Sequence, residues 1–124
     1  MNDKTPDQLT SGFLRREFYV VTTTPARSPE IRKLLPEHLE YQVKLEREGK
    51  LFGAGPFYEE GDDIPSGGMI ILRARSAAEA REIADADPFH KAGLRSYTLR
   101  KWMMNEGAMT FTVRYSDQSV EIAD

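Results

Sequence analysis

Two ionisable residues occupy positions where the sequence predicts buried helix faces, and they are the strongest candidates for chemistry. His38 lies within the amphipathic stretch 36–49, and Asp87 ends a run of small residues directly before Pro88. Each continues the apolar stripe of its own predicted helix, at spacings of three and four residues. If the two helices pack together, an imidazole and a carboxylate meet away from water. Such a pair is either a proton-transfer unit or a structural tie.

The chemistry expected of this pair is general acid/base catalysis. Histidine changes its charge near neutral pH, and a carboxylate that accepts its N–H fixes its tautomer. A carboxylate at the C-terminal end of a helix opposes the macrodipole, so we expect Asp87 to have a compensating partner, with His38 the nearest candidate. The alternatives stay open. His38 could be a core histidine bonded to a backbone carbonyl, and Asp87 could be an exposed residue that caps the turn 88–92.

The segment 51–58 is apolar but is interrupted by glycine and proline. Gly53 and Gly55 either leave room for a ligand beside the helix or mark a β-bulge that curves the sheet. We expect substrate contacts from Gly53, Gly55 and the adjacent Pro56, and from Phe89 after Pro88.

The remaining polar residues give weaker signals. His90, beside Lys91, is expected to be solvated, as is the acidic loop 59–67, which lacks the ligand spacing of a calcium-binding loop. The chain has no cysteine. Because no metal-ligand cluster, phosphate-binding loop or dinucleotide fingerprint occurs, we expect neither a metal nor an organic cofactor.

Composition narrows the possible partners. The 124 residues suffice for one domain, and 17 basic and 20 acidic residues give a net charge of −3. Basic residues form no cluster, so a nucleic-acid partner is not expected. The chain has no apolar run of the ~20 residues that span a bilayer, and its N-terminus lacks the apolar region of a secretory signal. A cytoplasmic location away from membranes is the expectation.

The elements that must position these residues are predicted from periodicity and capping signals. Strands are expected over 17–23, 51–58, 68–74 and 96–103. Helices are expected over 29–34, 36–48 and 77–86. Pro36 should separate the first two helices, because it lacks an amide proton and crowds the carbonyl four residues back. Gly49 should end the second helix, and Ser76 should cap the third.

This order of elements predicts an α+β fold of the ferredoxin-like βαββαβ type, with two helices on one face of a four-stranded antiparallel sheet. The other sheet face is also apolar, so a second copy of the chain is expected to cover it. An additional strand is predicted over 109–115, where it could extend the sheet or reach the partner. The expected organisation is a flexible tail over 1–15, a domain over 16–104 and a C-terminal extension over 105–124.

An ordered set of short motifs spans residues 18–102. The motifs are Pro36-Glu37-His38-Leu39, Glu48-Gly49-Lys50-Leu51, Gly53-Ala54-Gly55-Pro56, Gly67-Gly68-Met69-Ile70, Ser76-Ala77-Ala78-Glu79-Ala80, Ala86-Asp87-Pro88-Phe89 and Ala92-Gly93-Leu94. In order and spacing this set resembles the YciI-like family, the YCII-related domain.

The resemblance implies a dimeric α/β-barrel, in which two ferredoxin-like sheets pack face to face, and a His–Asp pair in a pocket. That pair falls on His38 and Asp87. Relatives in the wider group are isomerases, lyases or cofactor-free oxygenases that act on small, often aromatic molecules. An Arg that relatives often carry shortly before the His is replaced here by Leu34-Leu35. Arg32 could substitute for it if the turn before Pro36 places the Arg32 side chain near His38.

These observations predict a small cofactor-free enzyme of the isomerase or lyase type, with His38 and Asp87 as a dyad. The alternative is a non-catalytic domain that binds a small ligand or serves as an accessory module, in which the pair stabilises helix packing. The expected partners are a small molecule and a second copy of the chain, as a homodimer or a higher homo-oligomer.

Overall fold

The computed structural model describes residues 3–25 and 27–123, which form two compact units. The core unit is Glu17–Met103, and the terminal unit combines Met1–Arg16 with Met104–Asp124. The site residues predicted from the sequence, including His38 and Asp87, all lie in the core unit.

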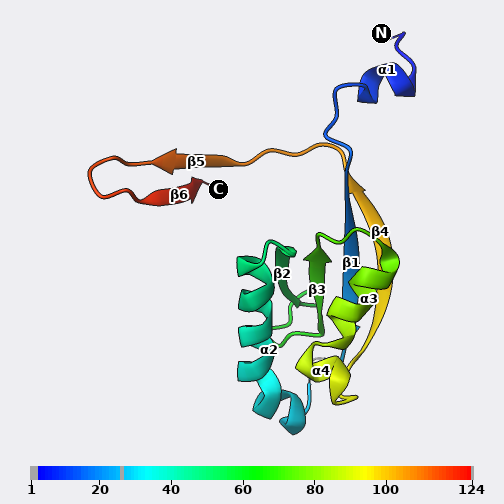
Figure 1. Cartoon of the computed structure of the whole chain (residues 1–124), viewed down its shortest axis with the longest axis vertical. Coiled ribbons are helices and arrows are strands. Elements are labelled where there is room, and N and C mark those ends of the chain that lie inside the picture. Colours follow the sequence, from blue (N-terminus) through cyan, green and yellow to red (C-terminus); the bar gives the residue numbers. More distant parts are fainter. Residues whose placement is uncertain (1–2, 26, 124) are drawn as a thin grey trace. The chain divides into compact units, whose positions relative to one another are not determined.

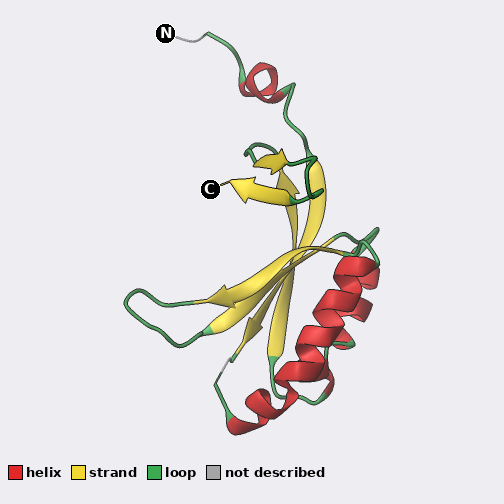
Figure 2. Ribbon diagram, turned by 90° about the vertical axis from the view of Figure 1, so that its left-hand side faces the viewer, coloured by secondary structure: helices red, strands yellow, loops and turns green. Residues whose placement is uncertain are grey.

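A four-stranded antiparallel sheet organises the core unit (Figure 1). Its strands, in the spatial order β2-β3-β1-β4, are β1 (Arg16–Thr24), β2 (Leu51–Phe57), β3 (Gly67–Leu72) and β4 (Ser96–Met104). Three helices cover one face, as Figure 2 shows: α2 (Pro29–Arg47), α3 (Ala77–Asp85) and the short α4 (Pro88–Lys91). The predicted ferredoxin-like α+β fold is confirmed.

Helix α2 runs continuously across Pro36, so the predicted break into two helices is wrong. Ser28 caps its start by accepting a hydrogen bond from the Ile31 amide at 3.2 Å, and the Ile31 side chain is buried. The carbonyl that Pro36 leaves without a donor belongs to Arg32, and both residues are exposed. Water can therefore hydrate that carbonyl at little cost. The helix ends at Arg47, and Gly49, with a φ of 76°, is the left-handed residue after the C-cap, as predicted.

The main hydrophobic core lies between the sheet and the helices. Strands β1 and β3 contribute pairs such as Tyr19 opposite Leu72 and Val21 opposite Ile70. Leu45 of α2 and the small residues of α3 complete the cluster, which consists of Tyr19, Val21, Leu45, Ile70, Leu72, Ala80, Ile83 and Ala84.

The buried face of α2 differs from the predicted one. The apolar stripe that His38 continues in the sequence includes Leu35 and Leu39, but both are exposed. The residues of α2 that are buried are Ile31, Gln42 and Leu45. The buried face therefore includes the polar Gln42, whose amide donates to Asp87, and leaves Leu35 and Leu39 outside it.

The opposite face of the sheet is apolar as well. Phe18 and Val20 are buried there, whereas Phe52 and Trp102 remain 38% and 39% exposed. The rings of Phe18 and Phe52 lie 4.5 Å apart, and those of Phe18 and Trp102 5.7 Å apart. No helix of the core unit covers this face (Figure 2).

The terminal unit contains three elements that the sequence only partly predicts. The tail includes a short helix, α1 (Pro6–Thr10), because Thr5 and Gln8 form a capping box and Pro6 suits the first helical position. The strand predicted over 109–115 is β5 (Thr110–Val113), but it does not extend the four-stranded sheet. It pairs instead with β6 (Val120–Ala123), a strand that was not predicted.

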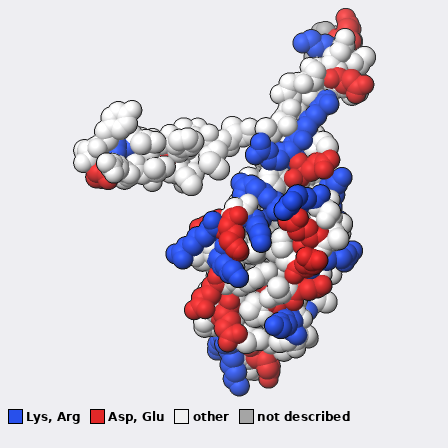
Figure 3. Space-filling view, viewed as in Figure 1, with Lys and Arg blue, Asp and Glu red and all other residues white. Residues whose placement is uncertain are grey.

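The surface of the core unit carries charges of both signs. On the face drawn in Figure 3, Lys and Arg side chains alternate with Asp and Glu over the helices. Among residues 3–25 and 27–123, no helix has the length and apolar character needed to cross a membrane.

Candidate active site

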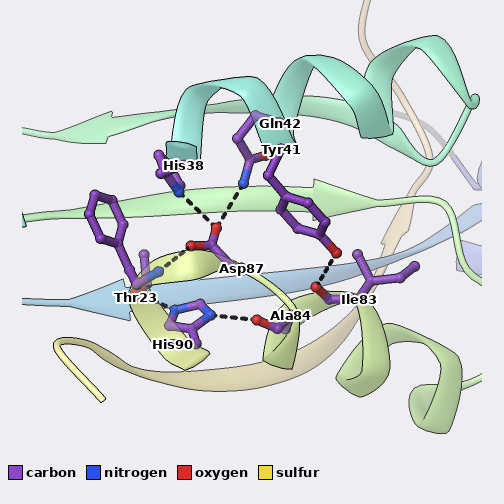
Figure 4. Close-up of polar contacts among 9 residues, drawn as sticks. Thr23, His38, Tyr41, Gln42, Ile83, Ala84, Asp87 and His90 are labelled. Carbon is purple, nitrogen blue, oxygen red and sulfur yellow. Dashed lines mark hydrogen bonds and ion pairs between the residues drawn. The ribbon is translucent and has the colours of Figure 1, made fainter. Parts of the chain in front are cut away.

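The side chains of His38 and Asp87 lie within hydrogen-bonding distance, although 49 residues separate them in sequence. His38 projects from the middle of α2, and its Nδ1 lies 2.7 Å from Oδ2 of Asp87 (Figure 4). The same oxygen accepts a hydrogen bond from Nε2 of Gln42, one turn further along α2, at 3.0 Å. Both contacts join α2 to the segment between α3 and α4.

Asp87 does not sit on α3, which ends at Asp85, so its predicted place in the apolar face of that helix is wrong. It is the N-cap of α4, where its Oδ1 accepts from the Phe89 amide at 2.9 Å. The macrodipole of α4 therefore favours the carboxylate instead of opposing it. Asp87 therefore does both things that the sequence offered as alternatives. Its Oδ1 caps the turn, and its Oδ2 accepts hydrogen bonds from His38 and Gln42 of α2. The capping residue is buried, not exposed as that alternative supposed.

Asp87 is held in its ionised form. Burial, which leaves the residue 1% exposed, acts to raise the pKa of its carboxyl group. The hydrogen bond and charge of His38 and the Phe89 amide act in the opposite direction and outweigh burial, so the pKa of Asp87 falls below its ordinary value. An ionised carboxylate only accepts hydrogen bonds, so Nδ1 of His38 is the donor.

The His38 ring is fixed on two sides. Asp87 holds Nδ1, and the ring stacks on Phe89 with centroids 4.4 Å apart. The side chain is 14% exposed, and Nε2 makes no hydrogen bond to any part of the chain that the structure describes. An imidazole in this state has one nitrogen occupied and one available.

Tyr41 ties α2 to α3 beside this pair. Its hydroxyl donates to the Ile83 carbonyl at 2.6 Å (Figure 4). Burial and the negative charge of Asp87 raise the pKa of Tyr41 to about 12, so it remains a neutral donor. It positions α2 without taking part in proton transfer at neutral pH.

His90 is not solvated, contrary to the expectation. Its Nδ1 lies 2.7 Å from the Ala84 carbonyl, and its Nε2 lies 2.7 Å from Oγ1 of Thr23 (Figure 4). Because a carbonyl only accepts, Nδ1 donates, and Nε2 pairs with the Thr23 hydroxyl. His90 thus links α4 to α3 and β1.

A cleft of about 1380 Å³ opens beside His38, between α2 and the strands β2 and β3. Its walls are largely apolar, and they include the exposed Leu35 and Leu39 of α2. All the residues expected to contact a substrate line it, namely Arg32, Gly53, Gly55, Pro56 and Phe89. The volume accommodates a small ring compound with room to spare.

The glycines of β2 have a structural explanation. The strand register shifts between Leu51 and Gly53, which is the bulge that the sequence left open. Gly53 and Gly55 pair with Ile71 and Met69, so a side chain at either position would point away from the helices. A Cβ on either glycine would meet no atom within 4 Å. These glycines therefore do not make room for a ligand on the helical side, although their backbone borders the cleft.

Two residues of the cleft escaped the sequence analysis. Gln42 is four residues from His38, so helical spacing alone places both on one face and could have identified it. Arg95 carries no such signal, because its position depends on how the chain after α4 folds back. Its guanidinium lies 4.2 Å above the centroid of the Phe89 ring.

Within the described residues, no three His, Asp or Glu side chains are grouped so that they could hold a metal ion. The polar side chains that line the cleft include one imidazole, one amide and several cationic groups.

Comparisons with known proteins give a consistent picture. Residues 18–103 match the family model described as YCII-related domain. The uncharacterized protein YjpA of Bacillus subtilis (strain 168) is 32% identical over 69 residues, which cover 56% of this chain and 75% of that protein. The fold is similar to that of 5-chloro-2-hydroxyhydroquinone dehydrochlorinase (TftG) from Burkholderia phenoliruptrix AC1100, solved in complex with 2,5-dihydroxybenzoquinone. That superposition has a TM-score of 0.54 at 23% identity and covers 68% of this chain and 92% of the other.

Proposed function

The chain belongs to the family of YCII-related domains, and we propose that it is a cofactor-free enzyme. The proposed reaction transfers a proton on a small molecule, such as an aromatic compound, bound in this cleft. The observation that carries the proposal is the His38 imidazole at the wall of the cleft, with Nδ1 bonded to an ionised carboxylate and Nε2 available. In this role Asp87 is a positioning residue, and His38 is the acid/base.

The reaction class follows from having a single base in an apolar cleft. In an isomerisation, Nε2 of His38 takes a proton from one atom of the substrate and returns it to another. In an elimination, Nε2 takes the proton, the electron pair it leaves behind forms a new double bond, and the leaving group departs with its own bonding pair. Neither reaction needs a redox partner.

The similar fold of the dehydrochlorinase supports this class, because removal of HCl is an elimination on a small ring. The cleft of this chain offers apolar side chains and backbone groups for such a ring. We propose that Pro56 and the leucines of α2 contact the ring and that backbone groups near Gly53 and Gly55 help to hold it. Arg32 would lie at the edge of the cleft, and Phe89 would hold the His38 ring in place by stacking on it.

A screen for turnover tests this proposal. Chlorinated hydroquinones would be assayed for chloride release, and aromatic enols and ketones for exchange of carbon-bound hydrogen in D₂O. We expect at least one of these compounds to react faster with the protein than in buffer. Binding of such compounds without any reaction would contradict an enzymatic role.

The alternative is a ligand-binding or accessory domain. It is favoured by the fact that the same hydrogen bonds of Asp87 tie α2 to α4, so the pair has a structural effect in any case. In that role, His38→Ala would lower the melting temperature while ligand binding remained and no catalysis was lost.

We propose further that a second copy of the chain covers the free face of the sheet, as a homodimer or within a higher homo-oligomer. The exposed rings of Phe52 and Trp102 beside the buried Phe18 supply the apolar area for it.

Light scattering should therefore give at least twice the chain mass of 14.1 kDa. Trp102→Glu should shift the protein toward the monomer, because it places a charge in the proposed interface. Arg75→Glu, at a side chain that is 94% exposed, is the control for added charge and should leave the mass unchanged. A monomeric wild-type protein would contradict the proposal.

A further inference from the structure

Arg95 and Gln42 carry unused hydrogen-bonding groups in the cleft. Building on the proposed function, we infer that these two residues select a substrate with an anionic oxygen and, on the same small molecule, a hydroxyl or N–H donor. The anionic oxygen would bind Arg95, and the donor would bind the amide oxygen of Gln42.

Arg95 is a cation whose side chain donates no hydrogen bond to residues 3–25 and 27–123. Its Nε is buried, and the described residues offer no hydrogen-bond acceptor to it. The three nearby donors to Asp87 are His38, Gln42 and the Phe89 amide, so the carboxylate is not bonded to Arg95. The guanidinium packs over the Phe89 ring, and both residues line the cleft. A fixed guanidinium with free N–H groups is suited to a carboxylate or an enolate oxygen.

Burial has a cost that a ligand would offset. It lowers the pKa of Arg95, while the negative charge of Asp87 acts to raise it. An anionic oxygen in the cleft would supply the hydrogen bonds that the guanidinium lacks.

Gln42 supplies the complementary group. It is 8% exposed, and its Nε2 donates to Asp87. Its Oε1 is buried and has no hydrogen-bond partner among the described residues, although the residue lines the cleft. Because Asp87 holds the amide by its nitrogen, the oxygen cannot exchange places with it. Since the described residues supply no donor for this oxygen, we assign it to a donor on the ligand.

The charge of the cleft agrees with an anionic ligand. Arg32 and Lys33 also line it, and Glu46 is the sole acidic residue among the described residues that do so. An oxygen bound at Arg95 would also lie in the same cleft as His38. Negative charge that develops there when His38 takes a proton would be stabilised.

The test uses three probes of one shape. 3-Hydroxybenzoate carries both the anionic oxygen and the donor, 3-hydroxybenzamide replaces the anion by a neutral amide, and benzoate lacks the hydroxyl. Their dissociation constants would be measured by NMR titration of the full chain. We expect the wild-type protein to bind 3-hydroxybenzoate at least ~10-fold more tightly than 3-hydroxybenzamide. It should also bind 3-hydroxybenzoate more tightly than benzoate.

Two variants assign these preferences to residues. Arg95→Met should abolish the preference for the anion, and Gln42→Met should abolish the preference for the hydroxyl. Arg75→Met removes the same charge at an exposed site outside the cleft and should change neither. Equal wild-type affinity for the charged and neutral probes would overturn the inference, even if a variant failed to fold. So would saturable binding of none of the probes, or an anion preference that survives Arg95→Met.

His38→Gln separates this inference from the proposed function. The variant should keep the preference for the anion, because Arg95 remains. If turnover occurs without any charge preference, the inference alone fails. If the preference is present and no substrate reacts, the proposed function alone fails.

Discussion

Replacing His38 by Gln is expected to reduce kcat by about 10²- to 10⁴-fold, the range for loss of a general acid/base. Glutamine can still donate a hydrogen bond to Asp87, so α2 and α4 remain joined and the fold should persist. The amide has no group that takes and returns a proton at neutral pH. KM should change little, since the apolar walls and Arg95 remain. Steady-state kinetics on the best substrate of the screen would measure both constants.

His90→Gln is the matched control for this prediction. His90 is the only other histidine of the chain, and its ring nitrogens are bonded to Thr23 and Ala84. Its replacement should cost stability, with kcat remaining within a few-fold of wild type. Wild-type turnover in a folded His38→Gln protein would discard the mechanism. Equal losses in both variants would indicate that structural damage, and not a missing base, lowers the rate.

The second large effect is expected at Asp87. Asp87→Ala leaves three buried or partly buried donors unpaired: Nδ1 of His38, Nε2 of Gln42 and the amide of Phe89. We expect the free energy of unfolding to fall by about 3–5 kcal/mol, because each buried donor left unpaired costs about 1–3 kcal/mol. Asp87→Asn should cost less, because its side-chain oxygen can still cap α4. Urea unfolding of the three proteins would measure the differences.

The same residue predicts a pH dependence. Because the folded-state pKa of Asp87 lies below the ordinary value of 3.8, its stabilising effect is fully present above that pH. It is lost as the pH falls through the lowered pKa. The stability difference between wild type and Asp87→Asn should therefore be constant near neutrality and shrink in acid below pH 3.8. A difference that stays the same down to the acid transition would contradict the ionised carboxylate.

The fold could be predicted from local signals because they agree with one another. Apolar strands, the Ser76 cap and the Gly49 stop fix the order of elements. The break predicted at Pro36 was wrong, since the cost of proline inside a helix depends on whether the freed carbonyl is exposed. The end of α3 at Asp85 was predicted to within one residue, but the short helix α4 was not predicted. Three residues later the chain begins a new helix, and only the tertiary structure shows that Asp87 caps it.

The candidate site was predictable in part. Sequence spacing placed His38 and Asp87 on inward-facing positions, and the structure brings them within 2.7 Å, while their catalytic role stays a prediction. Gln42 could have been found from its spacing to His38. Arg95 could not, because nothing in a sequence of ordinary composition distinguishes an arginine that folds back over Phe89 from one that points into solvent.

The central claim is that Asp87 holds His38 with Nδ1 protonated and Nε2 open to a ligand. Two-bond ¹H–¹⁵N NMR of the histidine side chains measures this directly in the wild-type protein. We predict that neutral His38 is protonated at Nδ1 and bare at Nε2, and that its Nε2 resonance shifts when 3-hydroxybenzoate is added. A proton on Nε2 of the neutral ring, or an Nε2 resonance that a bound ligand leaves unmoved, would contradict the account.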